Sequence, residues 1–174
     1  MHYERLTMRA MQFLTSILLT ALAVSTLRAQ AVLPDRGREP GLRENVFGLG
    51  IFGGPAGGLG LSFRHHLPSP FSYQLTGGII KVDQRLSYDI GVEAHYDLVR
   101  GPVSRFFVAG GTGYFYSGKR GHNEMDAPAR IGFGVGGELA LASGIHTSLE
   151  LLFTYLSDGT VLPLPQFGFF YYFY

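Results

Sequence analysis

The feature that most constrains the fold of this chain is an alternation of apolar and polar residues across residues 86–99. One parity is polar or small and comprises Ser87, Asp89, Gly91, Glu93, His95 and Asp97. The other is apolar and comprises Tyr88, Ile90, Val92, Ala94, Tyr96 and Leu98. Successive side chains of a β-strand point to opposite faces, whereas a helix would mix the two sets. The segment is therefore expected to form a β-strand with one apolar and one polar face.

Similar segments recur along the chain after Asn45, separated by clusters of Gly, Pro, Asp and Ser. The alternation is clear in residues 130–142 and 145–155, although Leu152 breaks it. It is weaker in residues 45–52, 58–65, 72–82, 105–117 and 166–174. A chain of 174 residues has room for one ordinary domain. The eight segments together predict an all-β domain of eight antiparallel strands in up-and-down order.

The polar parity combines charged residues with repeated glycines such as Gly132, Gly134 and Gly136. Glycine weakens a strand, so its repetition indicates a crowded interior where backbone or long side chains need room. The apolar parity is bulky, as in the lipid-facing band of a membrane barrel. An eight-stranded barrel has an interior just wide enough to be filled by side chains. Unpaired buried charges would be very costly, so we expect a paired polar network in the lumen, drawn from Arg64, Asp89, Glu93, Arg130, Glu138, His146 and Glu150.

Aromatic residues favour a membrane barrel over a soluble periplasmic one. Tyr88 and Tyr96 lie near opposite ends of one predicted strand, as expected for aromatic girdles at two membrane interfaces. Residues 166–174 carry aromatic side chains on both faces. An exposed edge of this kind would invite aggregation of a soluble protein, but a closed barrel in lipid leaves no unpaired edge. We therefore predict an eight-stranded transmembrane β-barrel over residues 45–174.

The N-terminal residues have the order of a bacterial secretory signal peptide. Arg5 and Arg9 precede an apolar run of roughly 15 residues, which is short of the ~20 needed for a membrane-spanning helix. Small residues follow, so we predict a signal peptide over residues 1–29, with cleavage after Ala29 or Ala31. The alternative is a retained N-terminal anchor helix. Residues 30–44 are polar and proline-containing, which predicts a flexible periplasmic lead-in.

The last strand resembles the C-terminal assembly signal of the small bacterial outer-membrane barrels, such as the OmpA membrane domain, OmpX and OmpW. The matching residues are Gln166, Gly168, Tyr171 and Phe173, and the departure is Tyr174, one residue beyond the usual terminal aromatic. The resemblance implies a location in the outer membrane, contact with its lipids and lipopolysaccharide, and recognition by the barrel-assembly machinery. Strand parity would then place residues 53–57, 83–85, 118–128 and 157–165 on the outer side, and residues 68–71, 100–104 and 143–144 on the periplasmic side.

Several site chemistries are disfavoured. The net charge is +1 with no basic stripe, so no nucleic acid is expected as a partner. Cysteine is absent, which excludes disulfides and thiolate metal sites. His65 and His66 would face opposite ways on a strand, most simply as an interfacial pair, and no ligand spacing involving His95 or His122 supports a metal site. The glycine-rich residues 53–58 precede a strand rather than a helix, so we interpret them as a turn and not a phosphate-binding loop.

One pair invites an enzymatic hypothesis. His146 and Ser148 are similar to the His-x-Ser pair of the lipid A 3-O-deacylases, with Glu138 or Glu150 available to orient the base. The family's motif continues with asparagine, where this chain has Leu149, and the pair lies on the lumen parity. We therefore expect a non-enzymatic barrel with a side-chain-filled lumen, no cofactor, and a structural or surface-contact role. The alternatives are a narrow channel for small or apolar solutes and an outer-membrane lipid A hydrolase.

Overall fold

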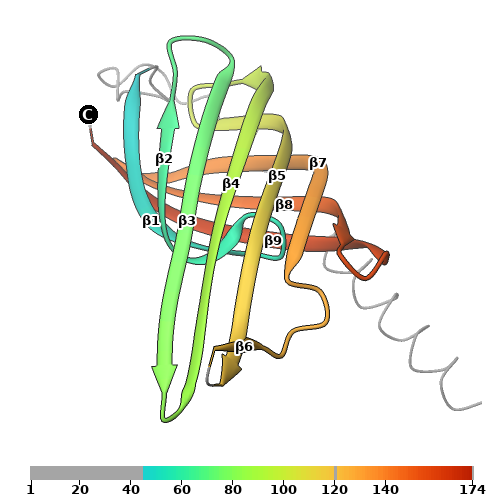
Figure 1. Cartoon of the computed structure of the whole chain (residues 1–174). Helices are drawn as coiled ribbons and strands as arrows, with labels where there is room; N and C mark the ends of the chain where they lie inside the picture. The colour runs from blue at the N-terminus through green and yellow to red at the C-terminus, as the bar shows by residue number, and fades with distance from the viewer. Residues whose placement is uncertain (1–44, 120, 174) are drawn as a thin grey trace, which may run out of the picture. The chain divides into compact units, whose positions relative to one another are not determined.

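Strands account for most of residues 45–119 and 121–173, the parts of the chain that this computed structural model describes (Figure 1). Their bounds are β1 Val46–Gly54, β2 Gly58–His66, β3 Phe71–Val82, β4 Arg85–Arg100, β5 Ser104–Lys119, β6 His122–Asn123, β7 Ala129–Ala142, β8 Ile145–Leu156 and β9 Val161–Phe173. Within these residues no helix has the length and apolar character needed to cross a bilayer. The predicted signal peptide and lead-in lie outside the described residues.

Antiparallel pairing closes eight of these strands into a ring. Each long strand pairs with the next along the chain, β4 pairs with β5, and β9 returns to β1 with Phe173 opposite Phe47. The two-residue β6 pairs with β5 alone and lies outside the ring. The prediction of an all-β, eight-stranded antiparallel barrel in up-and-down order is confirmed for the described residues.

The barrel has two distinct ends. We call the terminal end the one that holds the start of β1, the finish of β9 and the turns at residues 67–70, 101–103 and 143–144. The loop end holds the turns at residues 83–84 and 157–160 and the β5–β7 connection with β6. At this end β3, β4 and β5 extend beyond the other strands of the ring (Figure 1). The pair of β2 and β3 nearest this end is Leu61 with Gly77, whereas β3 and β4 remain paired up to Val82.

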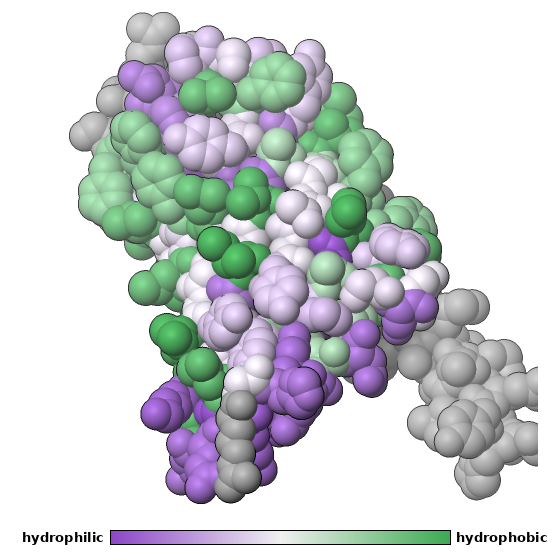
Figure 2. All heavy atoms as spheres, viewed as in Figure 1, coloured by the Kyte–Doolittle hydropathy of each residue, from purple (hydrophilic) through white to green (hydrophobic). Residues whose placement is uncertain are grey.

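Side chains segregate between the two faces of the wall as the sequence alternation predicts. Apolar residues of the outward parity are exposed, for example Ile90 at 61% and Phe133 at 65%. Charged residues of the inward parity are buried, for example Glu93 at 1%. Figure 2 shows apolar residues over the middle of the visible face and hydrophilic residues gathered at the loop end. The barrel wall is thus mainly apolar on its outer face and mainly polar on its inner face.

Apolar side chains nevertheless occupy parts of the lumen, in two clusters. One consists of Val46, Phe52, Phe170 and Tyr172, and the other of Ala56, Phe107, Ala109 and Leu152. The second cluster explains why Leu152 breaks the polar parity of its strand: it is fully buried against Ala56 in the interior.

The first turn, Pro55-Ala56-Gly57, bends into the lumen, and we call it the inward turn. Ala56 is fully buried, and the backbone N–H groups of Ala56 and Gly57 each donate to Gln166 Oε1 at 3.0 Å. A Cβ atom on Gly91 would lie 2.2 Å from the carbonyl oxygen of Gly57. The interpretation of residues 53–58 as a turn between strands is confirmed, and the turn lies at the loop end. It bends into the barrel because glycines of other strands leave space for it there.

The last strand also begins earlier than predicted. β9 starts at Val161 and includes Pro163 and Pro165, which the sequence suggested belonged to a loop. Proline lacks the N–H that a ladder needs, so it is tolerated at unpaired strand edges. Here β9 pairs with β1 only from Phe167 onward, so the proline-containing part has β8 as its single neighbour.

Candidate functional site

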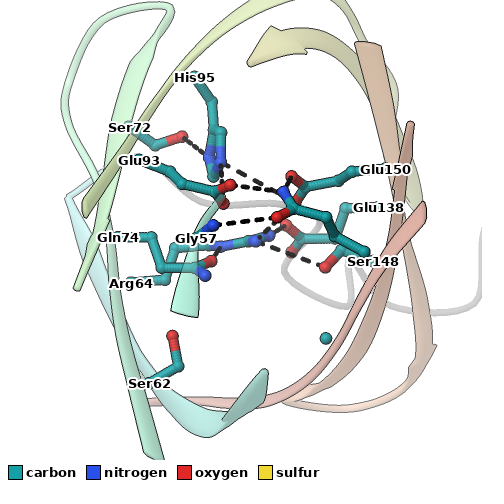
Figure 3. A network of polar contacts seen from close by, with 12 residues as sticks. Gly57, Ser62, Arg64, Ser72, Gln74, Glu93, His95, Glu138, Ser148 and Glu150 are labelled. Atoms are coloured by element: carbon teal, nitrogen blue, oxygen red, sulfur yellow. Dashed lines mark hydrogen bonds and ion pairs between the residues drawn. The ribbon is translucent and has the colours of Figure 1, made fainter. Parts of the chain in front are cut away.

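A connected set of charged and polar side chains fills the middle of the lumen, and Arg64 lies at its centre (Figure 3). Arg64 extends from β2 and is fully buried. Its guanidinium donates through Nε to Gln74 Oε1 at 2.7 Å, through Nη1 to Glu138 Oε2 at 2.7 Å and through Nη2 to Glu150 Oε1 at 3.1 Å. These bonds join β2 to β3, β7 and β8. Such a multidentate guanidinium is well suited to holding buried carboxylates.

Glu138 receives two guanidiniums at once. Its Oε2 accepts from Arg64 and from Arg105, whose Nε and Nη2 lie at 3.0 and 2.8 Å. Its Oε1 accepts from His146 Nδ1 at 2.9 Å. All these side chains are essentially excluded from solvent, so the bonds compensate the cost of burying the charges.

From Glu138 the network continues toward the terminal end. Arg105 Nη1 donates to Asp97 Oδ1 at 2.8 Å and to Ser72 Oγ at 2.9 Å. Asp97 Oδ2 in turn accepts from Arg100 Nε at 2.7 Å. Nearby, the Tyr172 hydroxyl and His66 Nε2 form a buried hydrogen bond of 2.7 Å. The polar contacts therefore reach from mid-lumen to the terminal end.

Toward the loop end, Gln166 connects the network to the inward turn. Its side-chain amide donates to Glu93 Oε1 and, at 3.4 Å, to Glu150 Oε2, while its oxygen holds the turn. Gln166 lies on β9 and Glu93 on β4, which face each other across the ring. The bond between them spans the lumen.

The structure brings together five of the seven residues proposed from the sequence: Arg64, Glu93, Glu138, His146 and Glu150. Asp89 and Arg130 belong to other contacts nearer the loop end. Asp89 Oδ1 accepts from the Leu59 backbone N–H at 2.6 Å. The Arg130 guanidinium lies 4.1 Å from the centre of the Phe115 ring and donates to the Ala127 carbonyl oxygen.

Sequence reasoning missed several members. Arg105 was left out, although it shares a strand parity with Phe107 and Ala109, both of which point inward. His66 was expected at an interface with His65, whereas it is buried in the lumen and His65 packs outside against Phe47 at 4.1 Å. The alternation along each strand predicts that both side chains point inward, because each residue follows or precedes an outward-facing neighbour.

The histidine–serine pair is enclosed. His146 and Ser148 are each 1% exposed on the inward face of β8. Ser148 Oγ accepts from Arg64 Nη2 at 3.4 Å, and His146 bonds to Glu138. A substrate approaching the outer wall does not reach the serine in this arrangement.

The four residues of the predicted assembly signal divide between the two faces of β9. Gln166 and Gly168 point inward, and Gly168 lies close to Ser148 Oγ. Tyr171 and Phe173 point outward, with their rings 5.2 Å apart.

No family model matches the chain, and comparison with curated proteins gave no significant match. The network ties together seven of the eight barrel strands, all but β1, through ion pairs and hydrogen bonds.

Proposed function

We propose that this chain is an integral barrel protein of a bacterial outer membrane, with a closed lumen and a structural or surface-contact role. The observation that carries the proposal is the distribution of side chains across the wall. Large apolar residues cover the outside, and the buried interior holds arginines, glutamates and histidines. In water this arrangement would expose the apolar surface and bury the charges, whereas in lipid both are placed favourably.

Aromatic contacts near both ends of the wall support the same proposal. Phe71 and Tyr96 pack edge to face at 4.9 Å toward the terminal end, and Tyr88 stacks on Tyr116 at 4.8 Å toward the loop end. Tyr88 and Tyr96 are eight residues apart on β4, which corresponds to about 26 Å along the strand. A strand tilt of about 35–45° reduces this to a height of about 20 Å, somewhat less than the apolar band of about 25 Å in membrane barrels.

The closed lumen supports a role that does not depend on conduction or catalysis. The polar network and the inward turn fill the interior at mid-height, so neither proposed alternative has a supporting contact. A narrow channel needs a continuous wet path, and a lipid A hydrolase needs lipid access to Ser148. Steady single-channel currents would favour the first, and altered lipid A that depends on Ser148 would favour the second.

Contacts with the surroundings follow from the two ends. Lys81, Arg85 and Lys119 are exposed at the loop end, where they would meet lipopolysaccharide phosphates. The outward aromatics of β9, Tyr171 and Phe173, are available at the terminal end for the assembly machinery. Contacts with lipopolysaccharide and with the barrel-assembly machinery are therefore part of this proposal.

A paired substitution tests the membrane location. Val135 points outward near the middle of β7, and Val82 is exposed beside the β3–β4 turn, beyond the closed part of the barrel. In lipid, Val135→Arg is expected to destabilise the folded protein by about 2–4 kcal/mol and Val82→Arg by about 0–1 kcal/mol. Equilibrium unfolding in phospholipid vesicles measures both.

Fractionation provides the companion measurement. The wild-type chain is expected in the outer-membrane fraction, with heat-modifiable migration on gels. Equal, near-zero costs for both arginine variants, or recovery of the chain in the soluble periplasmic fraction, would overturn the proposal in favour of a soluble barrel.

A further inference from the structure

Three side chains of ligand type converge on one point in the lumen. Glu93 and His95 extend from β4, and Glu150 extends from β8, three strands away around the ring (Figure 3). One nitrogen or oxygen atom of each lies within 4.8 Å of the others, and all three residues are buried. His95 Nε2 is 3.6 Å from Glu93 Oε2 and 3.9 Å from Glu150 Oε1.

Two of these atoms stand out from the rest of the network. Glu93 Oε2 and His95 Nε2 are the buried side-chain atoms that lack a hydrogen-bond partner within residues 45–119 and 121–173. Their separation of 3.6 Å is too long for a direct hydrogen bond. Buried polar atoms without partners are rare in native proteins and call for an explanation such as an ion.

Neighbouring contacts aim both atoms at the shared point. Glu93 Oε1 accepts from the Gln166 amide, which fixes the carboxylate and leaves Oε2 directed at the imidazole. His95 Nδ1 lies 3.4 Å from Ser72 Oγ. When Nδ1 donates to that oxygen, Nε2 presents a lone pair toward two carboxylate oxygens. Acceptors then face acceptors, and a positive species is needed between them.

The formal charges of the network lead to the same requirement. Its ionisable carboxylates are Glu93, Asp97, Glu138 and Glu150, and its guanidiniums are Arg64, Arg100 and Arg105. Asp97 and Glu138 contact the guanidiniums most closely, and Glu150 shares Arg64 with Glu138. Glu93 has no arginine partner among these pairs, so the surplus negative charge falls beside His95.

We propose that Glu93, His95 and Glu150 form a site for a divalent transition-metal ion such as Zn²⁺. Imidazole with carboxylate oxygens suits zinc and its neighbours better than calcium or magnesium. Tetrahedral zinc with bonds of about 2.1 Å places its ligand atoms about 3.4 Å apart, so small side-chain shifts complete the site. Ser72 and Gln166 supply the outer contacts that orient metal ligands. This inference revises the expectation of no metal drawn from the sequence.

The test uses the full chain refolded into detergent micelles with or without ZnCl₂. After removal of free metal, bound zinc per chain is measured by mass spectrometry. The wild type is expected to retain about one equivalent of zinc. Glu93→Gln and His95→Gln are each expected to retain less than a fifth as much. His65→Gln, which alters an outward-facing histidine, and Glu124→Gln, which alters an exposed carboxylate, are expected to match the wild type.

Two results would overturn the proposal. The wild type could retain no zinc, in which case a proton fills the gap between Glu93 and His95. Alternatively, zinc could be retained equally by Glu93→Gln and His95→Gln, which would place it elsewhere. If these variants do not fold, X-ray absorption at the zinc edge of the wild type decides: one imidazole with oxygen ligands supports the site, and any other imidazole count contradicts it.

Discussion

Replacing Arg64 by methionine tests how the lumen is held together. Methionine has similar length but no charge, so the variant keeps much of the volume and loses the hydrogen bonds to Gln74, Glu138 and Glu150. Breaking a buried ion pair by removing one partner costs about 3–5 kcal/mol, because the remaining charge stays buried. The ratio of folded to unfolded protein is then expected to fall by about two to four orders of magnitude.

The matched control is Arg85→Met. Arg85 pairs with Glu124 at 2.9 Å, a distance close to those of the Arg64 pairs, but the two side chains are 50% and 45% exposed. Exposed pairs contribute about 0–1 kcal/mol. The chain contains no tryptophan, so urea unfolding in micelles is followed by far-ultraviolet circular dichroism.

The triple variant Arg64→Met, Glu138→Gln, Glu150→Gln separates charge from packing. Neutralising both carboxylates is expected to recover part of the lost stability, because no unpaired carboxylate then remains beside the methionine and Arg105 keeps its ion pair with Asp97. Equal losses of unfolding free energy in Arg64→Met and Arg85→Met would show that the buried ion pairs contribute no more than the exposed one. The same conclusion would follow if the triple variant were less stable than Arg64→Met alone.

Three further variants, with Gly110→Ala as a control, probe the contacts around the network by the same unfolding assay. Gly91→Ala is expected to lower the free energy of unfolding by about 1–3 kcal/mol, because the new Cβ would meet the Gly57 carbonyl oxygen at 2.2 Å. The new Cβ of Gly110→Ala would lie 3.6 Å from its nearest neighbour, so this variant is expected to stay within about 0.5 kcal/mol of the wild type. Gln166→Leu removes the acceptor of two buried N–H groups and is expected to cost about 2 kcal/mol or more and to raise ion conductance in planar bilayers. Tyr172→Phe leaves His66 Nε2 without its hydroxyl partner and is expected to lower the free energy of unfolding by about 1–3 kcal/mol. A Gln166→Leu protein with wild-type stability and conductance would contradict the anchoring role of this side chain.

The sequence predicted the strands well because each lies between two different environments. In β4, Ile90 faces outward and Glu93 inward, so the period of two is nearly unbroken. The same alternation determined the number of strands and the direction of almost every side chain. It failed to separate strand from loop at Pro163 and Pro165, because proline tolerance depends on where β1 stops pairing.

The site was less predictable for a physical reason. Parity shows which side chains face the lumen, but it does not show which of them meet across it. The contact of Gln166 with the inward turn joins residues 110 positions apart. The space for that turn comes from Gly91, Gly113 and Gly132 on three other strands. The alternation within any one strand does not predict contacts between strands of this kind.

The dependence of the inward turn on Gln166 has a consequence for biogenesis. β1 and β2 are the first strands to emerge from the ribosome, and β9 is the last. The hairpin of β1 and β2 therefore lacks its acceptor until the final strand has docked. The inward turn can therefore take its place against Gln166 only when β9 closes the ring, so filling of this part of the interior and ring closure are coupled.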